Sequence, residues 1–133
     1  MRRITLGAVA TTVALAAVAA TPATGSVSAI GPHVYSTKIV GATPAVLDGT
    51  WRLTVNRRSF SVAKGTMFAV SGTARIVGNR ITFHDLGGPF SCRGAQATGV
   101  YSWRVSGKRL TLTAVREPCT GRKTILTKPF TRI

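Results

Sequence analysis

The chain has 133 residues, with 18 Lys and Arg against three Asp and Glu, and a formal net charge of +15. A chain of this length has room for one domain with one hydrophobic core and not for two. So large a cationic surplus favours an anionic partner or surface, with a role in solubility and no dedicated partner as the alternative. The three acids are predicted near loop ends rather than on facing inner walls, so we expect no pair of catalytic carboxylates of the glycosidase type.

The N-terminus has the pattern of an export signal. Met1-Arg2-Arg3 precedes an uncharged apolar run over residues 4–20, and small and turn-forming residues follow it. Val27-Ser28-Ala29 fits the small-x-small rule, so we expect cleavage after Ala29, with Ala23 as the second choice. Twin-arginine export and an uncleaved membrane anchor are the alternatives.

We therefore expect a secreted protein in three parts: a signal peptide at residues 1–29, a leader with one short strand at 30–46 and a barrel at 47–133. Loss of Arg2 and Arg3 with the signal peptide lowers the net charge from +15 to +13. The remaining chain of about 100 residues is enough for one small domain.

The chain contains two cysteines, Cys92 and Cys119. An even number in an exported chain predicts one disulfide. Closing a loop of this length should stabilise the fold by roughly 3 to 4 kcal/mol on the chain-entropy model. Neither cysteine has a C-x-x-C partner, so we expect neither a redox nor a metal-binding role for them.

The mature chain consists of short segments in which apolar and polar residues alternate, separated by tight turns rich in glycine. Gly72 lies in the longest segment, where it suits a bend or bulge, and Gly78-Asn79 has the form of a two-residue hairpin loop. We expect no helix in the mature chain. The predicted strands cover residues 34–39, 51–55, 59–63, 66–77, 80–85, 99–105, 110–116 and 122–133.

Eight short strands predict an all-β fold, an eight-stranded antiparallel up-and-down barrel with one disulfide. An even strand number lets the first and last strands pair antiparallel. Because consecutive strands alternate in direction, the loops that hold Cys92 and Cys119 fall at the same end of the barrel, which supports their pairing. A β-sandwich is the alternative architecture.

Several short motifs carry a resemblance to a known group: Gly49-Thr50-Trp51, Gly72-Thr73, Gly99-Val100-Tyr101-Ser102-Trp103, Leu110-Thr111-Leu112 and Cys119-Thr120-Gly121-Arg122. The chain resembles the calycins, the superfamily of lipocalins and their small secreted bacterial relatives, from Asp48 to the C-terminus. The resemblance implies a lipocalin-like barrel in which Trp51 is structural and a basic residue packs on its ring. We expect that residue to be Arg122, which the alternation places at the Trp51 end.

The alternation also predicts which side chains point into the barrel, where they either line a ligand cavity or fill the interior completely. The inward set is Leu53, Val55, Phe60, Val62, Phe68, Val70, Phe83, Tyr101, Trp103 and Leu112. Basic residues gather at the end opposite the cysteines and form a predicted anion-binding mouth. This set is Arg57, Arg58, Arg80, Lys108, Arg109 and Arg132, whereas Asp48, Asp85 and Glu117 fall at the cysteine end.

Two functions follow from these patterns. The resemblance implies binding of a small hydrophobic or amphiphilic, anionic ligand inside the barrel. The alternative is a basic surface-interaction module that adheres to anionic lipid or cell-wall polymer, with a filled barrel. Nucleic acid is not expected, because the cations are scattered and no aromatic residues interleave with a basic stripe.

We expect no enzymatic activity. His84 and Asp85 are adjacent in a strand and so point to opposite faces. The chain has no Gly-x-Ser-x-Gly, phosphate loop or metal-ligand cluster, so no metal and no cofactor is expected either. The sequence leaves the oligomeric state open.

Overall fold

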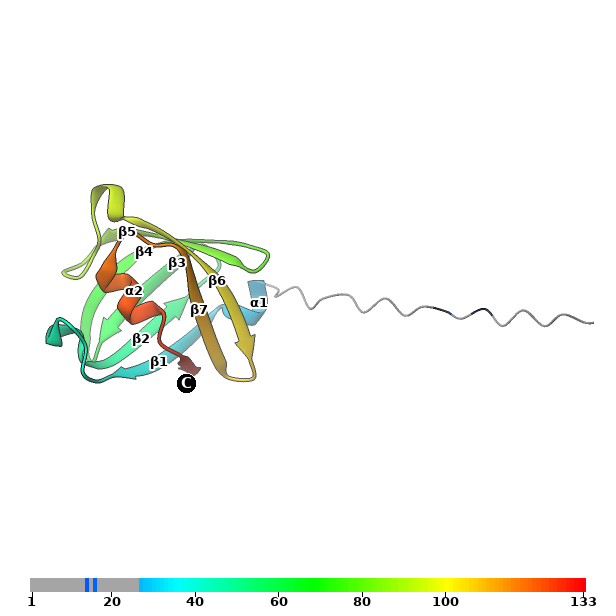
Figure 1. Cartoon of the computed structure of the whole chain (residues 1–133), viewed down its shortest axis with the longest axis horizontal. Helices are drawn as coiled ribbons and strands as arrows, with labels where there is room; N and C mark the ends of the chain where they lie inside the picture. Colours follow the sequence, from blue (N-terminus) through cyan, green and yellow to red (C-terminus); the bar gives the residue numbers. More distant parts are fainter. Residues whose placement is uncertain (1–13, 15, 17–26) are drawn as a thin grey trace, which may run out of the picture.

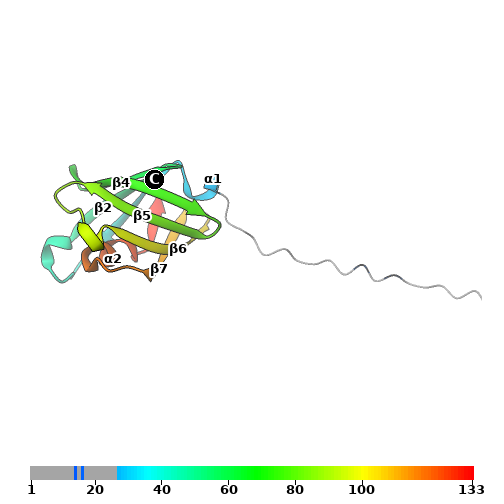
Figure 2. The ribbon, with the colours of Figure 1, turned by 90° about the horizontal axis from the view of Figure 1, so that it is seen from above.

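The computed structural model describes residues 14, 16 and 27–133, so the predicted signal peptide lies almost entirely outside the described residues (Figures 1 and 2). The strands form a closed barrel in which each one pairs antiparallel with the next and the last returns to the first. The prediction of an eight-stranded antiparallel barrel is confirmed. The strands are β1 (His33–Ile39), β2 (Gly49–Val55), β3 (Ser59–Lys64), β4 (Met67–Val77), β5 (Arg80–Gly87), β6 (Thr98–Ser106), β7 (Arg109–Arg116) and β8 (Phe130–Arg132).

The strands β1 to β7 lie where the alternation of apolar and polar residues predicts them. Gly78 adopts φ = 56°, the left-handed conformation that a tight hairpin loop between β4 and β5 requires. The β4–β5 register shifts between Ser71 and Gly72, which confirms the predicted bulge. A Cβ atom at position 72 would lie 2.8 Å from the ring of Phe60, so only glycine fits there.

The last predicted strand, residues 122–133, is wrong over most of its length, and so is the expectation of no helix. The chain forms helix α2 (Thr120–Leu126), and only Phe130–Arg132 pairs as β8. The buried residues of α2 are Arg122, Ile125 and Leu126, a spacing of three and four that belongs to a helix and not to a strand. Pro129 follows, and because it has no N–H group it cannot donate to a sheet.

The two ends of the barrel are closed differently (Figure 1). At one end, the short helix α1 (Val27–Ile30) places Ile30 in the core, and the Tyr35 hydroxyl donates a hydrogen bond of 2.8 Å to the Ile30 carbonyl. At the other end, α2 lies beside the 3-10 turns η1 (Ala45–Leu47) and η2 (Gly94–Gln96) and the disulfide. No helix in the described part of the chain is long and apolar enough to cross a membrane.

Phe68 is the one inward-facing residue whose predicted position is wrong. It is 51% exposed, whereas Ala69 and Val70 are buried. The β3–β4 register explains the change, because Val62 pairs with Val70 but its neighbour Ala63 pairs with Phe68. The extra residue of this bulge reverses the inward and outward phase of the strand, which moves Phe68 to the outside.

The other predicted inward residues form a closely packed core. The Phe83 ring lies edge-on between Phe60, at a centroid distance of 4.8 Å, and Tyr101, at 5.7 Å. Such edge-to-face contacts are typical of well-packed aromatic cores. The buried members of the predicted set are Leu53, Val55, Phe60, Val62, Val70, Phe83, Tyr101, Trp103 and Leu112.

Candidate functional site

Cys92 and Cys119 form a disulfide, with Cα atoms 6.2 Å apart, as predicted. Loops from three parts of the chain meet there, and we call this part of the molecule the disulfide end. The opposite end, which carries the turns β2–β3, β4–β5 and β6–β7, we call the basic end. Asp48, Asp85 and Glu117 all lie at the disulfide end, as the alternation of strand direction predicts.

Arg122, at the start of α2, is the centre of a buried ionic network at the disulfide end. Its Nε and Nη2 groups donate to the two oxygens of Glu117 at 2.7 and 2.8 Å. Nη1 lies 2.9 Å from Oδ1 of Asp85. The remaining N–H groups donate to the carbonyl oxygens of Ala97 and Gln96 at 2.7 and 2.9 Å. Arg122 therefore donates four hydrogen bonds and also forms an ion pair with Asp85, whose Oδ1 has no hydrogen-bond partner. Pairing with two acids is the condition under which a buried charge is tolerated.

The two carboxylates connect this network to the disulfide. The backbone N–H of Cys92 donates to Asp85 at 2.7 Å, and that of Cys119 donates to Glu117 at 2.9 Å. The Tyr101 hydroxyl also donates to Glu117. The Asp85 and Glu117 side chains are 1% and 0% exposed, so both acids are removed from the surface.

The network changes the protonation behaviour of its members. Burial raises the pKa of Tyr101 far above its ordinary value, and the hydrogen bond to Glu117 raises it further. Burial by itself would raise the pKa of Glu117, but hydrogen bonds from Arg122, Tyr101 and the Cys119 N–H outweigh it and lower that pKa. The network therefore favours an ionised Glu117 and a neutral Tyr101.

Gly99, on β6, faces this network directly. A Cβ atom there would lie 2.8 Å from Nη2 of Arg122 and would also collide with the Glu117 carboxylate. The glycine of the Gly99-Val100-Tyr101 motif is thus required by the packing of the ion pair against the sheet. Sequence reasoning missed this network, although the i, i+3, i+4 pattern at Arg122, Ile125 and Leu126 was a readable sign of the helix that supplies it.

Trp51 is fully buried, and its indole Nε1 donates to the Leu47 carbonyl at 2.7 Å. The expectation that Arg122 packs on its ring is wrong, because the cation over the ring is Lys64, with Nζ 5.8 Å from the centroid. The partner of Trp51 comes from the neighbouring strand, since Trp51 and Lys64 are register partners between β2 and β3. Arg122 is instead held by the two acids.

Space inside the barrel is small. A cavity of about 60 Å³ lies between α2 and the inner walls, beside Trp51, Phe60, Arg122 and Ile125. A cavity needs roughly 10 to 15 Å³ to hold one buried water, whereas pockets for small-molecule ligands have volumes of roughly 300 to 1,000 Å³. This cavity has room for a few waters but not for a fatty acid.

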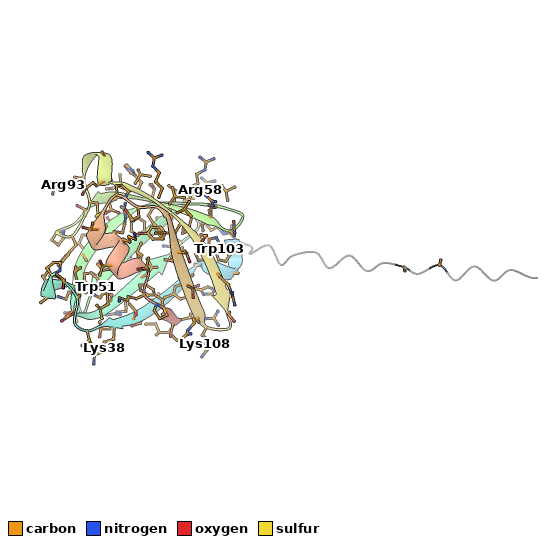
Figure 3. All side chains as sticks on the ribbon, in the orientation of Figure 1. Lys38, Trp51, Arg58, Arg93, Trp103 and Lys108 are labelled. Carbon is orange, nitrogen blue, oxygen red and sulfur yellow. A yellow bond between two sulfur atoms is a disulfide. The ribbon has the colours of Figure 1, made fainter. Side chains whose placement is uncertain are left out.

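The basic end carries the six cations that the sequence groups together: Arg57, Arg58, Arg80, Lys108, Arg109 and Arg132. All but the half-buried Arg132 are exposed. Figure 3 shows Arg58 and Lys108 toward the end where α1 lies, with Arg93 and Trp51 toward the other. Because Ile30 and Tyr35 close this end from inside, it is a basic surface and not the open mouth that the sequence predicts.

The outer face near the disulfide holds His84, which is exposed and contacts the Thr98 hydroxyl at 2.7 Å through Nδ1. Its neighbour Asp85 is buried, so the two residues point to opposite faces, as predicted. Among residues 27–133, no group of three His, Cys, Asp or Glu side chains is placed to hold a metal ion.

Comparison of the chain with known protein families, with curated proteins and with solved structures found no match in any of the three.

Proposed function

We propose that the protein is a basic binding module that attaches to an anionic polymer through the basic end. One observation carries the proposal: within the described residues, Arg122 is the one Lys or Arg that pairs with a carboxylate side chain. Two of the three acids, Asp85 and Glu117, form ion pairs with Arg122. The third, Asp48, accepts a hydrogen bond of 2.6 Å from the Ala42 N–H. The cations of the basic end are therefore free to bind external anions.

The packing of the barrel favours this outer-surface function over ligand binding inside. The inward side chains are buried, and the cavity under α2 is about 60 Å³. A filled interior leaves the outer surface as the place where the protein can meet a partner.

The composition of the basic end favours a hydrated polymer over a bilayer at this end. Near its six cations, the exposed large apolar side chains are Val77 and Ile133, which are well separated in sequence and stand singly. Arginine binds phosphate, sulfate or carboxylate groups through paired N–H donors without needing apolar contact. A cell-wall polymer that carries such groups fits this surface.

We also propose that the chain is an exported member of the calycin superfamily. The closed antiparallel barrel, the burial of Trp51 in the Gly49-Thr50-Trp51 motif and the signal-like N-terminus support this assignment. A disulfide is typical of oxidising compartments, which agrees with export.

The proposal is tested by titrating a phosphate polymer, such as polyphosphate or poly(glycerol phosphate), into the protein over a series of salt concentrations. We expect affinity to fall steadily with salt, because each bound cation releases counterions from the polymer. Replacing Arg57, Arg58 and Arg109 with Gln should weaken binding by about tenfold or more, which corresponds to about 1.4 kcal/mol.

The matched control replaces Arg93, Arg116 and Lys123 with Gln, which removes the same charge from the rest of the surface. This control should weaken binding much less. Equal losses from the two triple variants would show that net charge alone drives attachment and that the basic end has no special role.

A further inference from the structure

Most of the exposed large apolar side chains gather at the disulfide end, opposite the basic end. They lie on the β1–β2 connection, at the start of β4 and at the end of β5, elements that follow one another around the barrel. We call this set the apolar rim: Val40, Val46, Met67, Phe68 and Leu86, which are 80%, 54%, 47%, 51% and 68% exposed. Single exposed apolar residues are ordinary, but a group at one end of a small protein marks an interaction surface.

Two β-bulges and one hydrogen bond help to hold side chains of the rim outward. The β3–β4 bulge reverses the phase of β4 and turns Phe68 out of the core. A second bulge, between Ser71 and Gly72, places Leu86 outside the β4–β5 ladder. Lys64 donates to the Val46 carbonyl and so fixes the β1–β2 connection against β3. The exposure of the rim is therefore a property of the barrel itself.

Cations without acid partners lie on or beside the elements that carry the rim. These are Lys38, Arg52, Lys64 and Arg93, and none of them forms a salt bridge with a described residue. Beside Leu86, a hollow of about 380 Å³ lies on the outer side of the β5–β6 loop, lined by His84, Ser91 and Arg93 among others. It offers the Arg93 guanidinium group next to the exposed Leu86 side chain.

We propose that the apolar rim docks the protein on an anionic lipid bilayer. Apolar side chains would enter the boundary between headgroups and acyl chains, while the surrounding cations and the hollow at Arg93 meet the lipid phosphates. A soluble polymer offers no apolar phase, so the combination of rim and cations selects a membrane. Docking by this end points the basic end away from the bilayer, where it is free to hold the polymer of the proposed function.

The test measures binding of the protein without its signal peptide to vesicles of phosphatidylcholine with and without phosphatidylglycerol. We expect binding to the anionic vesicles, with a residual fraction at high salt that apolar insertion supports. Replacing Val46, Phe68 and Leu86 with Ser should weaken binding by about tenfold or more and remove the salt-resistant fraction. The matched control replaces Val77 and Ile133, exposed apolar residues outside the rim, with Ser and should bind like the wild type.

A second variant, Phe68→Trp, reports insertion directly while the barrel stays intact. The fluorescence of the introduced tryptophan should be protected from quenching by iodide when anionic vesicles are present. It should remain quenchable when only the phosphate polymer is present. The two proposals fail separately, because the polymer titration uses the basic-end variant and the vesicle assay uses the rim variant.

Three results would overturn the membrane proposal. The rim variant could bind anionic vesicles as the wild type does, or the basic-end variant could lose as much vesicle binding as the rim variant. Alternatively, sedimentation could show that the wild type self-associates without vesicles and the rim variant does not, which would make the rim an interface between copies of this chain.

Discussion

Arg122 shows how one residue connects charge, packing and covalent structure. Its guanidinium group holds Asp85 and Glu117, which also accept hydrogen bonds from the backbone N–H groups of the two bonded cysteines. Removing one member of a buried ionic network leaves the others uncompensated, which costs about 3 to 5 kcal/mol in comparable cases. The network therefore links α2 to the backbone on both sides of the disulfide.

The protonation state of this network predicts how stability depends on pH. The folded-state pKa of Glu117 is lowered, so its contribution is present above the unfolded value of about 4.3 and is lost as pH falls through the folded-state pKa. The pKa of Tyr101 is raised, so its contribution is present below about 10 and is lost as pH rises further. Urea unfolding between pH 2 and pH 11 should show both losses.

Two variants assign these losses to their residues. Glu117→Gln should lower stability at neutral pH and flatten the acid side of the profile, and Tyr101→Phe should flatten the alkaline side. An acid profile that keeps its full slope in Glu117→Gln would show that Glu117 is not the titrating group.

At the scale of elements, α2 replaces the first part of the expected last strand. It covers the inner walls of β2 to β4 at the disulfide end, and its own residues Ile125 and Leu126 are buried against them. Its first residue follows Cys119 directly, so the disulfide ties the helix to the β5–β6 loop. We therefore expect the bond to act on the placement of α2 more than on the barrel.

Replacing Cys92 and Cys119 together with Ser should lower the free energy of unfolding by about 2 to 4 kcal/mol. The barrel should keep its β-sheet circular dichroism, because the strand pairings do not depend on the bond. Amide hydrogen exchange over Thr120–Leu126 should become faster than exchange in β2 to β5. Uniformly faster exchange throughout the protein would contradict a local role for the disulfide.

The short helix α1 predicts a difference between the two candidate processing sites. Ile30 is fully buried, and its carbonyl accepts a hydrogen bond from Tyr35. A protein beginning at Ile30 carries its charged amino group on a core residue, whereas one beginning at Thr24 does not. We expect the shorter form to be less stable by about 1 to 3 kcal/mol in thermal or urea unfolding. Equal stability of the two forms would show that α1 is not needed to close the barrel.

At the scale of the whole molecule, the interior and the surface have separate roles. The interior holds aliphatic and aromatic side chains and one buried ionic network around Arg122. The surface carries a large excess of cations, with an apolar rim at one end. Both proposed interactions therefore depend on the outer surface.

Native mass spectrometry of the protein purified from its own host provides a direct check on the filled barrel. We expect the mass of the polypeptide alone, and no displaceable fatty acid in calorimetry, because the cavity of about 60 Å³ is too small for one. A co-purifying lipid bound at one per barrel would contradict this and would return the function to ligand binding inside.

The barrel was predictable from local patterns, because the first seven strands alternate apolar and polar residues over most of their length and glycine-rich turns separate many of them. The sequence also determined which end holds Cys92, Cys119 and the acids, since strand direction alternates. The excess of cations was likewise readable from composition. These features depend on residues close together in sequence.

The remaining features depend on contacts between distant segments of the chain. The bulge that exposes Phe68 depends on the pairing of β4 with β3, and the choice of helix over strand at Arg122 depends on the buried acids of β5 and the β7–α2 connection that it reaches. Whether the barrel has a cavity depends on how side chains from all of its walls meet. Each of these outcomes is set by contacts between residues far apart in the chain, which a local pattern does not contain.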